Sequence, residues 1–351
     1  MLLNKATQEN ASDIYMISGR PLSYKVDGII KEISEERLMP EDTQDLIEEI
    51  YKVSGNRSIT RVSDKGDDDF SFSLPGVARF RVSAYKQRGT LAAVIRVVAF
   101  DLPNPSSLGI PDIVLKLGEK KKGLVLVTGP AGSGKSTTLS CIIDQINANR
   151  NAHIITLEDP IEFLHRHNKS IVSQREISLD TSSYVVALRA ALRQAPDVIL
   201  LGELRDSETI NIAMTAAETG HLVISTLHTV GAANTIDRIV DAFPAEQQGQ
   251  IRVQLAMVLQ AVVSQQLVPN NDGHVMPAFE IMLVNDAIRN MIRESKIHQI
   301  DSVITSSQAD GMITMDASLM RLYKEGQISD LTALAFSTQQ ELMKRKMAAG
   351  M

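Results

Sequence analysis

The sequence GLVLVTGPAGSGKSTTLSCIIDQI, residues 123–146, carries the strongest structural signal of the chain. Its apolar run Leu124–Val127 is too short for a core helix and predicts a buried strand. Residues 129–136 follow as G-x-x-x-x-G-K-S, and the apolar residues after them recur at helical spacing. A strand, a glycine-rich loop and a helix in this order predict a phosphate-binding P-loop rather than a glycine turn before an ordinary helix.

This loop is predicted to hold the phosphate groups of a nucleotide. Its glycines let the backbone turn its N–H groups towards phosphate oxygens, and the helix that follows adds the positive end of its dipole. Lys135 is long enough to reach the β- and γ-phosphates, and the Ser136 hydroxyl is placed to bind Mg²⁺. The predicted nucleotide-binding residues are Gly129, Pro130, Ala131, Gly132, Ser133, Gly134, Lys135, Ser136 and Thr137.

The composition disfavours several classes of protein. The 351 residues, 44% hydrophobic and 22% charged, predict an ordered globular chain of two or three domains. The net charge of −6 gives no support for a protein that tracks nucleic acid, because such proteins usually carry a basic face. Cys141 is the single cysteine, so we expect no disulfide framework, a buried packing role for this residue and a reduced, cytosolic protein.

Membrane-spanning and exported classes are not indicated either. No apolar run approaches the roughly 18 residues that a membrane-spanning helix needs. The N-terminal residues also lack the apolar segment of a signal peptide. We therefore expect any role at a membrane to depend on a partner protein.

Residues 1–100 are predicted to form a small α/β domain. Strand-like segments with turn signals occupy residues 12–33, and an apolar stripe at helical spacing marks residues 40–53. Alternating apolar residues between positions 70 and 100 predict an antiparallel meander with one face on a core. Residues 101–111, which hold three prolines, a glycine and two serines, predict an interdomain linker.

From residue 112 to 351 the pattern is that of an α/β domain. Strand-like runs alternate with helical ones, which predicts a parallel sheet with right-handed crossovers. The continuous apolar runs are typical of strands buried on both faces, and helical patterns are predicted to dominate after about residue 245. The predicted strands are 123–128, 154–158, 197–203 and 221–228, and the predicted helices are 137–149, 181–194 and 206–219.

Acidic residues and a histidine follow three of these strands. Ligands bind at the carboxyl ends of parallel strands, where Glu158, Glu203 and His228 are expected. One carboxylate orients or deprotonates the attacking water in ATP hydrolysis, another holds Mg²⁺ through water, and the imidazole senses the γ-phosphate. Gly202 stands where P-loop proteins usually have an aspartate. Glu203 is therefore a candidate for both Mg²⁺ and water, and Glu158 is a second candidate for the general base.

Five arginines form a further group of candidates. Arg79, Arg81 and Arg96 lie on the predicted meander, and Arg189 and Arg193 are four residues apart on one predicted helix. An isolated P-loop domain has too little positive charge for the γ-phosphate transition state, and rings of such domains supply it from a neighbour as an arginine finger. A solvated basic surface explains any one of these arginines equally well.

The motifs together resemble a known family. GPAGSGKS, ITLEDPIE, LLGELRD and GHLVISTLHT, in this order and spacing, resemble the secretion-superfamily ATPases of type II secretion and type IV pili. The chain is most similar to the pilus retraction ATPases, the PilT family, because it is short, has one cysteine where a zinc motif needs four, and carries AIRNMIRE at 287–294. The segments LRQAPD, 192–197, and QQLVP, 265–269, are as similar to the accessory retraction ATPases, the PilU group.

This resemblance implies a fold and a set of partners. It implies a PAS-like α/β N-terminal domain, a RecA-like P-loop ATPase domain with a helical C-terminal part, a homohexamer, and ATP and Mg²⁺ as cofactors. The implied partners are the inner-membrane platform protein of the pilus machine and the pilin fibre, with the protein cytoplasmic and peripheral to the inner membrane. The implied site residues are catalytic Glu203, Glu158, His228, Arg81 and Arg96, and metal-binding Ser136 and Glu203.

The sequence leaves three functions open. The first is a motor, main or accessory, in which ATP hydrolysis drives the pilus platform and shortens the fibre. The second is a nucleic-acid translocase on the same RecA-like fold, which the net charge and the aromatic content of 4% disfavour, so no nucleic-acid partner is expected. The third is a nucleotide-gated interaction module with negligible turnover, which the intact Lys135, Glu158 and Glu203 disfavour.

Overall fold

The protein forms two compact units. The computed structural model describes residues 2–26, 28–55, 57–98, 102 and 104–349. One unit comprises Met1–Leu102 with Glu162–Arg166, and the other comprises Pro103–Ile161 with His167–Met351. The predicted linker, 101–111, includes positions 101 and 103, which lie outside the described residues, so its role as a linker stays a prediction. No helix in the described ranges is long and apolar enough to cross a membrane.

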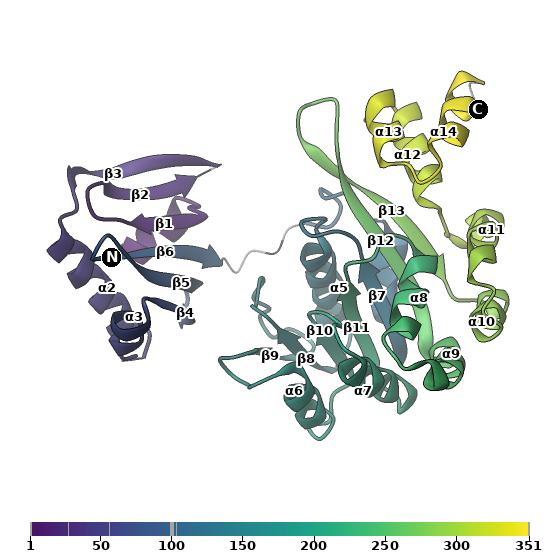
Figure 1. The fold of residues 1–351 in the computed structure, drawn as a ribbon, viewed down its shortest axis with the longest axis horizontal. Helices are drawn as coiled ribbons and strands as arrows, with labels where there is room; N and C mark the ends of the chain where they lie inside the picture. Colours follow the sequence, from purple (N-terminus) through teal and green to yellow (C-terminus); the bar gives the residue numbers. More distant parts are fainter. Residues whose placement is uncertain (1, 27, 56, 99–101, 103, 350–351) are drawn as a thin grey trace. The chain divides into compact units, whose positions relative to one another are not determined.

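The first unit is built on a six-stranded antiparallel sheet with the order β3-β2-β1-β6-β5-β4 (Figure 1). The predicted helix over 40–53 and the antiparallel meander are confirmed. Ile47 and Ile50 are buried as the helical stripe predicts, whereas Val53 in the last turn is exposed. The elements are α1 (Leu2–Gln8), β1 (Asp13–Met16), β2 (Pro21–Val26), β3 (Ile29–Arg37), α2 (Pro40–Val53), α3 (Thr60–Lys65), β4 (Asp67–Leu74), β5 (Ala78–Gln87) and β6 (Thr90–Val98).

The second unit centres on a seven-stranded sheet with the order β13-β12-β7-β11-β10-β8-β9, parallel except for the β12–β13 pair. The mixed α/β fold class predicted from the sequence is thereby confirmed. Its strands are β7 (Gly123–Thr128), β8 (His153–Glu158), β9 (Ile171–Glu176), β10 (Val198–Leu201), β11 (Leu222–Leu227), β12 (Leu259–Pro269) and β13 (Val275–Leu283). Its α-helices are α4 (Asp112–Leu115), α5 (Lys135–Asn149), α6 (Tyr184–Ala191), α7 (Ser207–Glu218), α8 (Ala232–Asp241), α9 (Ala245–Val258), α10 (Asp286–Arg293), α11 (Ile300–Ser306), α12 (Met315–Lys324), α13 (Asp330–Phe336) and α14 (Gln340–Ala348).

Helices cover both faces of this second sheet. Side chains alternate along a strand, so Leu124 and Leu126 of β7 join one core with α6 to α10, whereas Val125 and Val127 join the opposite core with α4 and α5. Burial on both faces explains why these strands are uninterrupted apolar runs. Cys141 of α5 is buried in the second of these cores, which raises the pKa of its thiol to about 11 and confirms its packing role.

Residues 259–283 form a long antiparallel hairpin, β12 and β13, where helices were predicted to dominate. That prediction is wrong for this segment. Buried polar residues such as Ser264 and Gln265 interrupt the apolar pattern of β12, and its leucine and glutamine residues have good helix propensity. Pairing with β7 on one side and β13 on the other overrides that local preference. Strand β9 and helix α3 are further elements that the sequence patterns did not predict.

A buried carboxylate joins the hairpin to two helices. Glu280 of β13 accepts hydrogen bonds from the backbone N–H of Ala232 at the start of α8 (2.7 Å) and of Met315 at the start of α12 (3.2 Å). The first N–H groups of a helix have no partner inside it, so each carboxylate oxygen satisfies one of them. Burial nevertheless raises the pKa of Glu280, because the loss of hydration outweighs both hydrogen bonds.

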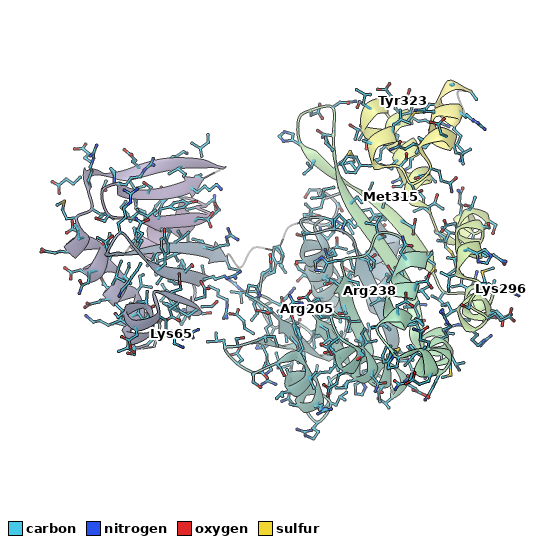
Figure 2. All side chains as sticks on the ribbon, in the orientation of Figure 1. Lys65, Arg205, Arg238, Lys296, Met315 and Tyr323 are labelled. Atoms are coloured by element: carbon cyan, nitrogen blue, oxygen red, sulfur yellow. The ribbon has the colours of Figure 1, made fainter. Side chains whose placement is uncertain are left out.

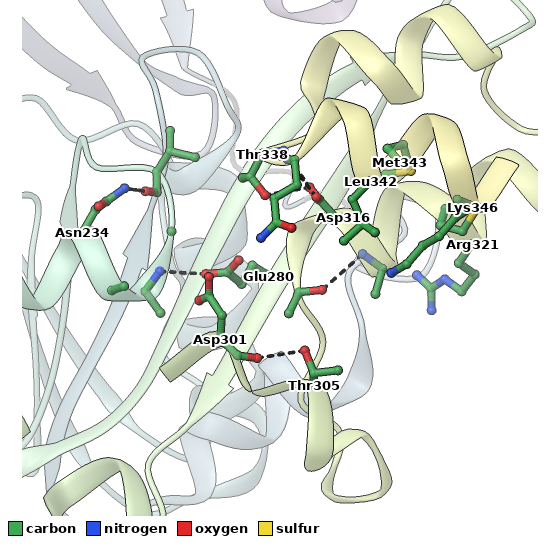
Figure 3. A pocket seen from close by; sticks show the side chains of 18 of the residues that line it. Asn234, Glu280, Asp301, Thr305, Asp316, Arg321, Thr338, Leu342, Met343 and Lys346 are labelled. Carbon is green, nitrogen blue, oxygen red and sulfur yellow. Dashed lines mark hydrogen bonds between the residues drawn. The ribbon is translucent and has the colours of Figure 1, made fainter. Parts of the chain in front are cut away.

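A cavity of about 870 Å³ lies beside Glu280 and is bounded by α8, α11, α12 and α14 (Figure 3). Asp301 and Asp316 contribute acidic groups to it, and Arg321 and Lys346 contribute basic ones. Burial and the charge of Asp316 raise the pKa of Asp301. None of the lining residues belongs to the predicted phosphate site, so this cavity is a separate feature of the second unit.

Replacing Glu280 by glutamine is expected to lower the free energy of unfolding by about 1–3 kcal/mol, because an amide has one acceptor oxygen for two buried N–H donors. Thermal unfolding of E280Q measures this loss. The matched control is E325Q, a change at the exposed Glu325 that should stay within about 0.5 kcal/mol of the parent. An E280Q protein as stable as the control would contradict the bridging role.

The pH dependence of stability gives a second test of the role of Glu280. The folded-state pKa of Glu280 is raised above its unfolded value, so its contribution to stability is fully present below the unfolded pKa. That contribution is lost as the pH rises through the folded pKa. The E280Q variant should therefore lose less stability than its parent over this rise in pH.

Candidate active site

Adjacent parallel strands bring the predicted site residues to one edge of the second sheet. Strand β7 leads into the phosphate loop, and its neighbour β11 ends one residue before His228. Next to β11 lies β10, which precedes Glu203, and next to β10 lies β8, which ends at Glu158. Because all four strands run in the same direction, their carboxyl ends meet, and the predicted convergence of these residues is observed.

The phosphate loop rests against β12. Gly129 has a φ of 143°, and a Cβ atom on it would lie 2.1 Å from the carbonyl oxygen of Gln265. Gly134 precedes α5 with a φ of 83°, in the left-handed region that favours glycine. The side chain of Gln265 also accepts a hydrogen bond from the Thr138 hydroxyl at 2.6 Å. Gln265 therefore supports the loop from the neighbouring strand, a role that no sequence pattern predicts.

Lys135 closes the loop on itself. Its Nζ donates hydrogen bonds to the carbonyl oxygens of Gly129 and Pro130, both at 2.8 Å, and its side chain is buried. Burial lowers the pKa of Lys135, and the nearby carboxylate of Glu203 acts in the opposite direction. The ammonium group therefore lies within electrostatic reach of the strand-end carboxylate as well as of the loop.

The loop presents polar groups that lack partners. The hydroxyls of Thr128 and Ser133 are buried and make no hydrogen bond to the described residues. The backbone N–H groups of Gly132, Gly134 and Ser136 have no backbone acceptor in the described part of the chain. Buried polar groups without partners cost free energy, and a helix N-terminus favours an anion. The loop therefore fits the phosphate groups of a nucleotide, with the exposed Ser136 hydroxyl beside them.

Glu203 is the centre of a charged cluster. Its carboxylate forms an ion pair with Arg205 and lies 3.4 Å from Nε2 of His228. The Glu203 side chain is 14% exposed, compared with 59% for His228 and 67% for Arg205, so Glu203 is the most buried residue of the cluster. Arg205 is labelled in Figure 2. Arg205 was not among the predicted residues. Its spacing of two residues from Glu203 was the available signal, since such residues share a side in extended chain.

Thr156 and Gln174 help to orient Glu158. The Thr156 hydroxyl and the Gln174 amide both donate hydrogen bonds to its Oε1, at 2.6 Å and 3.3 Å. An ionised carboxylate accepts hydrogen bonds, so these donors help to fix the orientation of the group. This arrangement suits a carboxylate that orients water.

The meander arginines lie where they were predicted. Arg81 and Arg96 are opposite each other on β5 and β6 of the first unit. Nε of Arg96 donates a hydrogen bond to Oδ1 of Asp13 at 3.0 Å, and the Arg96 side chain is 64% exposed. The strand-end carboxylates belong to the second unit, so the action of Arg81 and Arg96 on a nucleotide stays a prediction.

The two other arginine candidates have local partners. Arg189 forms an ion pair of 2.7 Å with Glu208, and Arg193 donates to the carbonyl oxygen of Arg189 at 3.0 Å. The predicted helix over 181–194 is shorter in the structure, because α6 ends at Ala191. Arg193 therefore lies beyond the end of the helix. The prediction that Arg189 and Arg193 share one helix face is wrong.

Comparison with known proteins identifies the family of the chain. The chain matches the type II/IV secretion system protein family over residues 1–343. It is 44% identical to the type IV pilus retraction ATPase PilT of Pseudomonas aeruginosa, over 93% of this chain and 94% of that protein. It is 39% identical to the type IV pilus ATPase PilU of the same organism, over 95% of this chain and 87% of that protein.

A solved structure gives the same result. The crystal structure of the pilus retraction motor PilT with bound ADP matches with a TM-score of 0.89 and 46% identity, over 98% of each chain. The chain belongs to the PilT family of type II/IV secretion ATPases. The resemblance recognised from the four motifs is thereby confirmed.

The segment AIRNMIRE of the PilT family forms helix α10. Ile288 and Ile292 are buried against the core, and the Asn285 side chain caps the helix by accepting from the N–H of Ile288 at 3.0 Å. Arg289 donates to the carbonyl oxygens of the last turn of α9, at 2.6 and 3.2 Å. Arg293 remains exposed and donates to the side chain of Asn290 at 2.9 Å. Arg289 therefore ties α10 to α9, whereas the hydrogen bond of Arg293 lies within its own helix.

Two substitutions test the chemistry of the site. Lys135→Ala is expected to abolish ATP hydrolysis, because it removes the cation at the β- and γ-phosphates. Glu203→Gln is expected to lower turnover by about 10²–10⁴-fold while nucleotide still binds, because the amide keeps the shape and removes the proton acceptor. Steady-state phosphate release and the fluorescence of a labelled ATP analogue measure the two properties. Lys344→Ala, an exposed change in α14, is the control.

Either outcome for Glu203→Gln assigns the two carboxylates. A large fall in turnover with preserved nucleotide binding supports Glu203 as the proton acceptor. Turnover near that of the parent would leave Glu158 as the sole candidate for the general base.

Proposed function

We propose that this chain is an Mg²⁺-dependent ATPase that assembles as a homohexameric motor and powers type IV pilus retraction and twitching motility. The observation that carries the proposal is the strand-end cluster of Lys135, Glu158, Glu203 and His228 beside the phosphate loop, where the Ser133 hydroxyl has no hydrogen-bond partner among the described residues. The similarity to a pilus retraction ATPase over almost the whole chain supplies the biological context.

The chain's own residues divide the work of hydrolysis. The loop N–H groups and Lys135 bind the β- and γ-phosphates of ATP, and Ser136 and Glu203 hold Mg²⁺, the latter through water. When bound, this ion neutralises charge that develops on the phosphates. Of the two carboxylates, one takes a proton from the attacking water and the other orients it. His228, which lies 3.4 Å from Glu203, senses the γ-phosphate. A change in its position would be transmitted to the residues between β11 and α8.

The proposed site is completed by arginines of the first unit. Arg81 and Arg96 close onto the nucleotide in a hexameric ring and supply the positive charge that a P-loop domain lacks by itself. Arg81→Ala should lower turnover with little loss of stability, because the Arg81 side chain is exposed. Arg96→Ala should lower turnover too, but it also removes the partner of Asp13, whose side chain is 7% exposed, and so lowers stability as well. ATPase assays linked to sedimentation measure activity and assembly together, with the exposed Arg37→Ala on β3 as the control. A fully active monomer would contradict this part of the proposal.

The ring is proposed to act at the cytoplasmic face of the inner membrane. Its partner there is the platform protein of the pilus machine, and its mechanical load is the pilin fibre. An accessory role, like that of PilU, is the second candidate function. The higher identity to PilT than to PilU favours the main role. Addition of nucleic acid should leave the ATPase rate unchanged, since neither the charge nor the aromatic content supports such a partner.

Motility in a deletion strain tests the proposal. Cells without this chain should keep pili that do not retract, and the parent chain should restore retraction. Arg293→Ala should keep substantial ATPase activity and fail to restore retraction, because Arg293 is exposed on α10 and its hydrogen bond is to Asn290 of the same helix. Ile288→Ala is the packing control, expected to lower stability by about 2–5 kcal/mol. Normal retraction with Arg293→Ala would reduce α10 to a packing element.

A further inference from the structure

Gly202 stands where P-loop proteins usually have an acidic residue, and the structure shows what fills that space. A Cβ atom on Gly202 would lie 2.6 Å from the hydroxyl oxygen of Tyr184, which is closer than side-chain carbons approach other atoms. Its next contacts, with the backbone of Leu157 and Glu158, would be ordinary ones at 3.4 and 3.6 Å. Gly202 is not among the residues with positive φ. The tyrosine hydroxyl, and not the backbone conformation, therefore limits which side chain fits at this position.

The surroundings hold this hydroxyl in place. Tyr184 is the first residue of α6, and the preceding Ser183 caps the helix by accepting from the N–H of Val186 at 3.3 Å. The ring of Tyr184 packs against the core that the sheet forms with α6 to α10. The N–H of Gly202 donates to the carbonyl oxygen of Leu157 at 2.8 Å, so the strand ends that face the hydroxyl are also fixed. A stiff aromatic side chain between a capped helix and a paired strand end has little freedom to move its oxygen.

Three carboxylates act on this hydroxyl. Burial raises the pKa of Tyr184 well above its usual value, and the charges of Asp159, Glu203 and Glu158 raise it further, while Arg205 opposes them. The phenol therefore keeps its proton at physiological pH and is a neutral O–H donor. The hydroxyl makes no hydrogen bond to the described residues of the chain. It is a protonated donor close to the position of Gly202 and within electrostatic reach of both carboxylates proposed to act on water.

We propose that Tyr184 is a positioning residue for hydrolysis: its hydroxyl takes the place of the acid missing at Gly202 and donates a hydrogen bond to the attacking water. This inference rests on the proposed ATPase function. The water accepts from Tyr184 with one lone pair, attacks phosphorus with the other, and points an O–H bond at a carboxylate. That O–H bond breaks as its proton passes to the carboxylate, the new P–O bond forms, and the bond from phosphorus to the ADP oxygen breaks. Tyr184 keeps its own proton throughout.

Tyr184→Phe isolates the hydroxyl, because it keeps the ring and its packing. The proposal expects kcat to fall by about tenfold to a hundredfold, the effect of misplacing a reacting group. The KM for ATP, the binding of a fluorescent ATP analogue and the melting temperature should stay close to those of the parent. A structural role for Tyr184 would move the melting temperature or KM instead of kcat alone.

A matched pair of double variants tests the position of the hydroxyl. Gly202→Ala alone should lower the melting temperature, since its methyl group collides with the Tyr184 oxygen. Combining it with Tyr184→Phe removes the collision and should restore the melting temperature but not kcat. Tyr184→Phe with Gly202→Ser adds a hydroxyl close to the lost one and should recover part of kcat. The serine and alanine variants differ by one oxygen atom.

Each result supports or overturns a distinct statement. A parent chain without ATP hydrolysis overturns the proposed function. The effect of Gly202→Ala on the melting temperature is measured independently of ATP hydrolysis. If the parent hydrolyses ATP and Tyr184→Phe has the same kcat, the positioning role is wrong and the ATPase function stands. Equal kcat values for the serine and alanine double variants would show that a hydroxyl at this position does not orient the water.

Discussion

Glycines at the two ends of strand β7, Gly123 and Gly129, allow β12 to approach this strand closely. A side chain on Gly129 would meet the carbonyl oxygen of Gln265 at 2.1 Å, and one on Gly123 would meet the Gln260 side chain at 2.5 Å. Both partners lie on β12, which pairs with β7 from Leu259 to Ser264. This close approach lets Gln265 reach Thr138 beneath the phosphate loop. The shape of the loop thus depends on a strand that begins more than a hundred residues later in the chain.

The electrostatics of the site follow from where the parallel strands end. Glu158, Asp159 and Glu203 gather at one edge of the sheet, and their mutual repulsion is offset by Lys135 and Arg205. An aspartate in place of glycine after β10 would add a fourth carboxylate to this edge. A neutral phenol occupies that space instead, so the site keeps a polar group there without a further negative charge.

Sequence patterns predicted the parts of the molecule whose signals are local. The eight residues of the phosphate motif and the apolar runs of β7, β8, β10 and β11 identified the parallel sheet, and their ends identified Glu158, Glu203 and His228. Strand β12 was missed because its pairing with β7, not its own composition, determines its conformation. Gln265 and Tyr184 were missed for a related reason. Each reaches the site from a distant segment, and no spacing within the chain reports such a contact.

The hairpin that supports the phosphate loop also reaches the C-terminal helices. On β12, next to Gln265, the Ser264 hydroxyl accepts from the N–H of Gly231 at 2.9 Å, just before α8. Opposite Ser264 on β13, Glu280 binds the N–H groups that begin α8 and α12. A chain of contacts couples two sites only if the free energy of those contacts differs between two conformations of the protein. These hydrogen bonds meet that condition more readily than apolar contacts would, because a buried N–H group that loses its acceptor carries the full cost of desolvation. A shift of β12 under the loop would therefore be opposed at α8 and α12 until those helices moved with the hairpin.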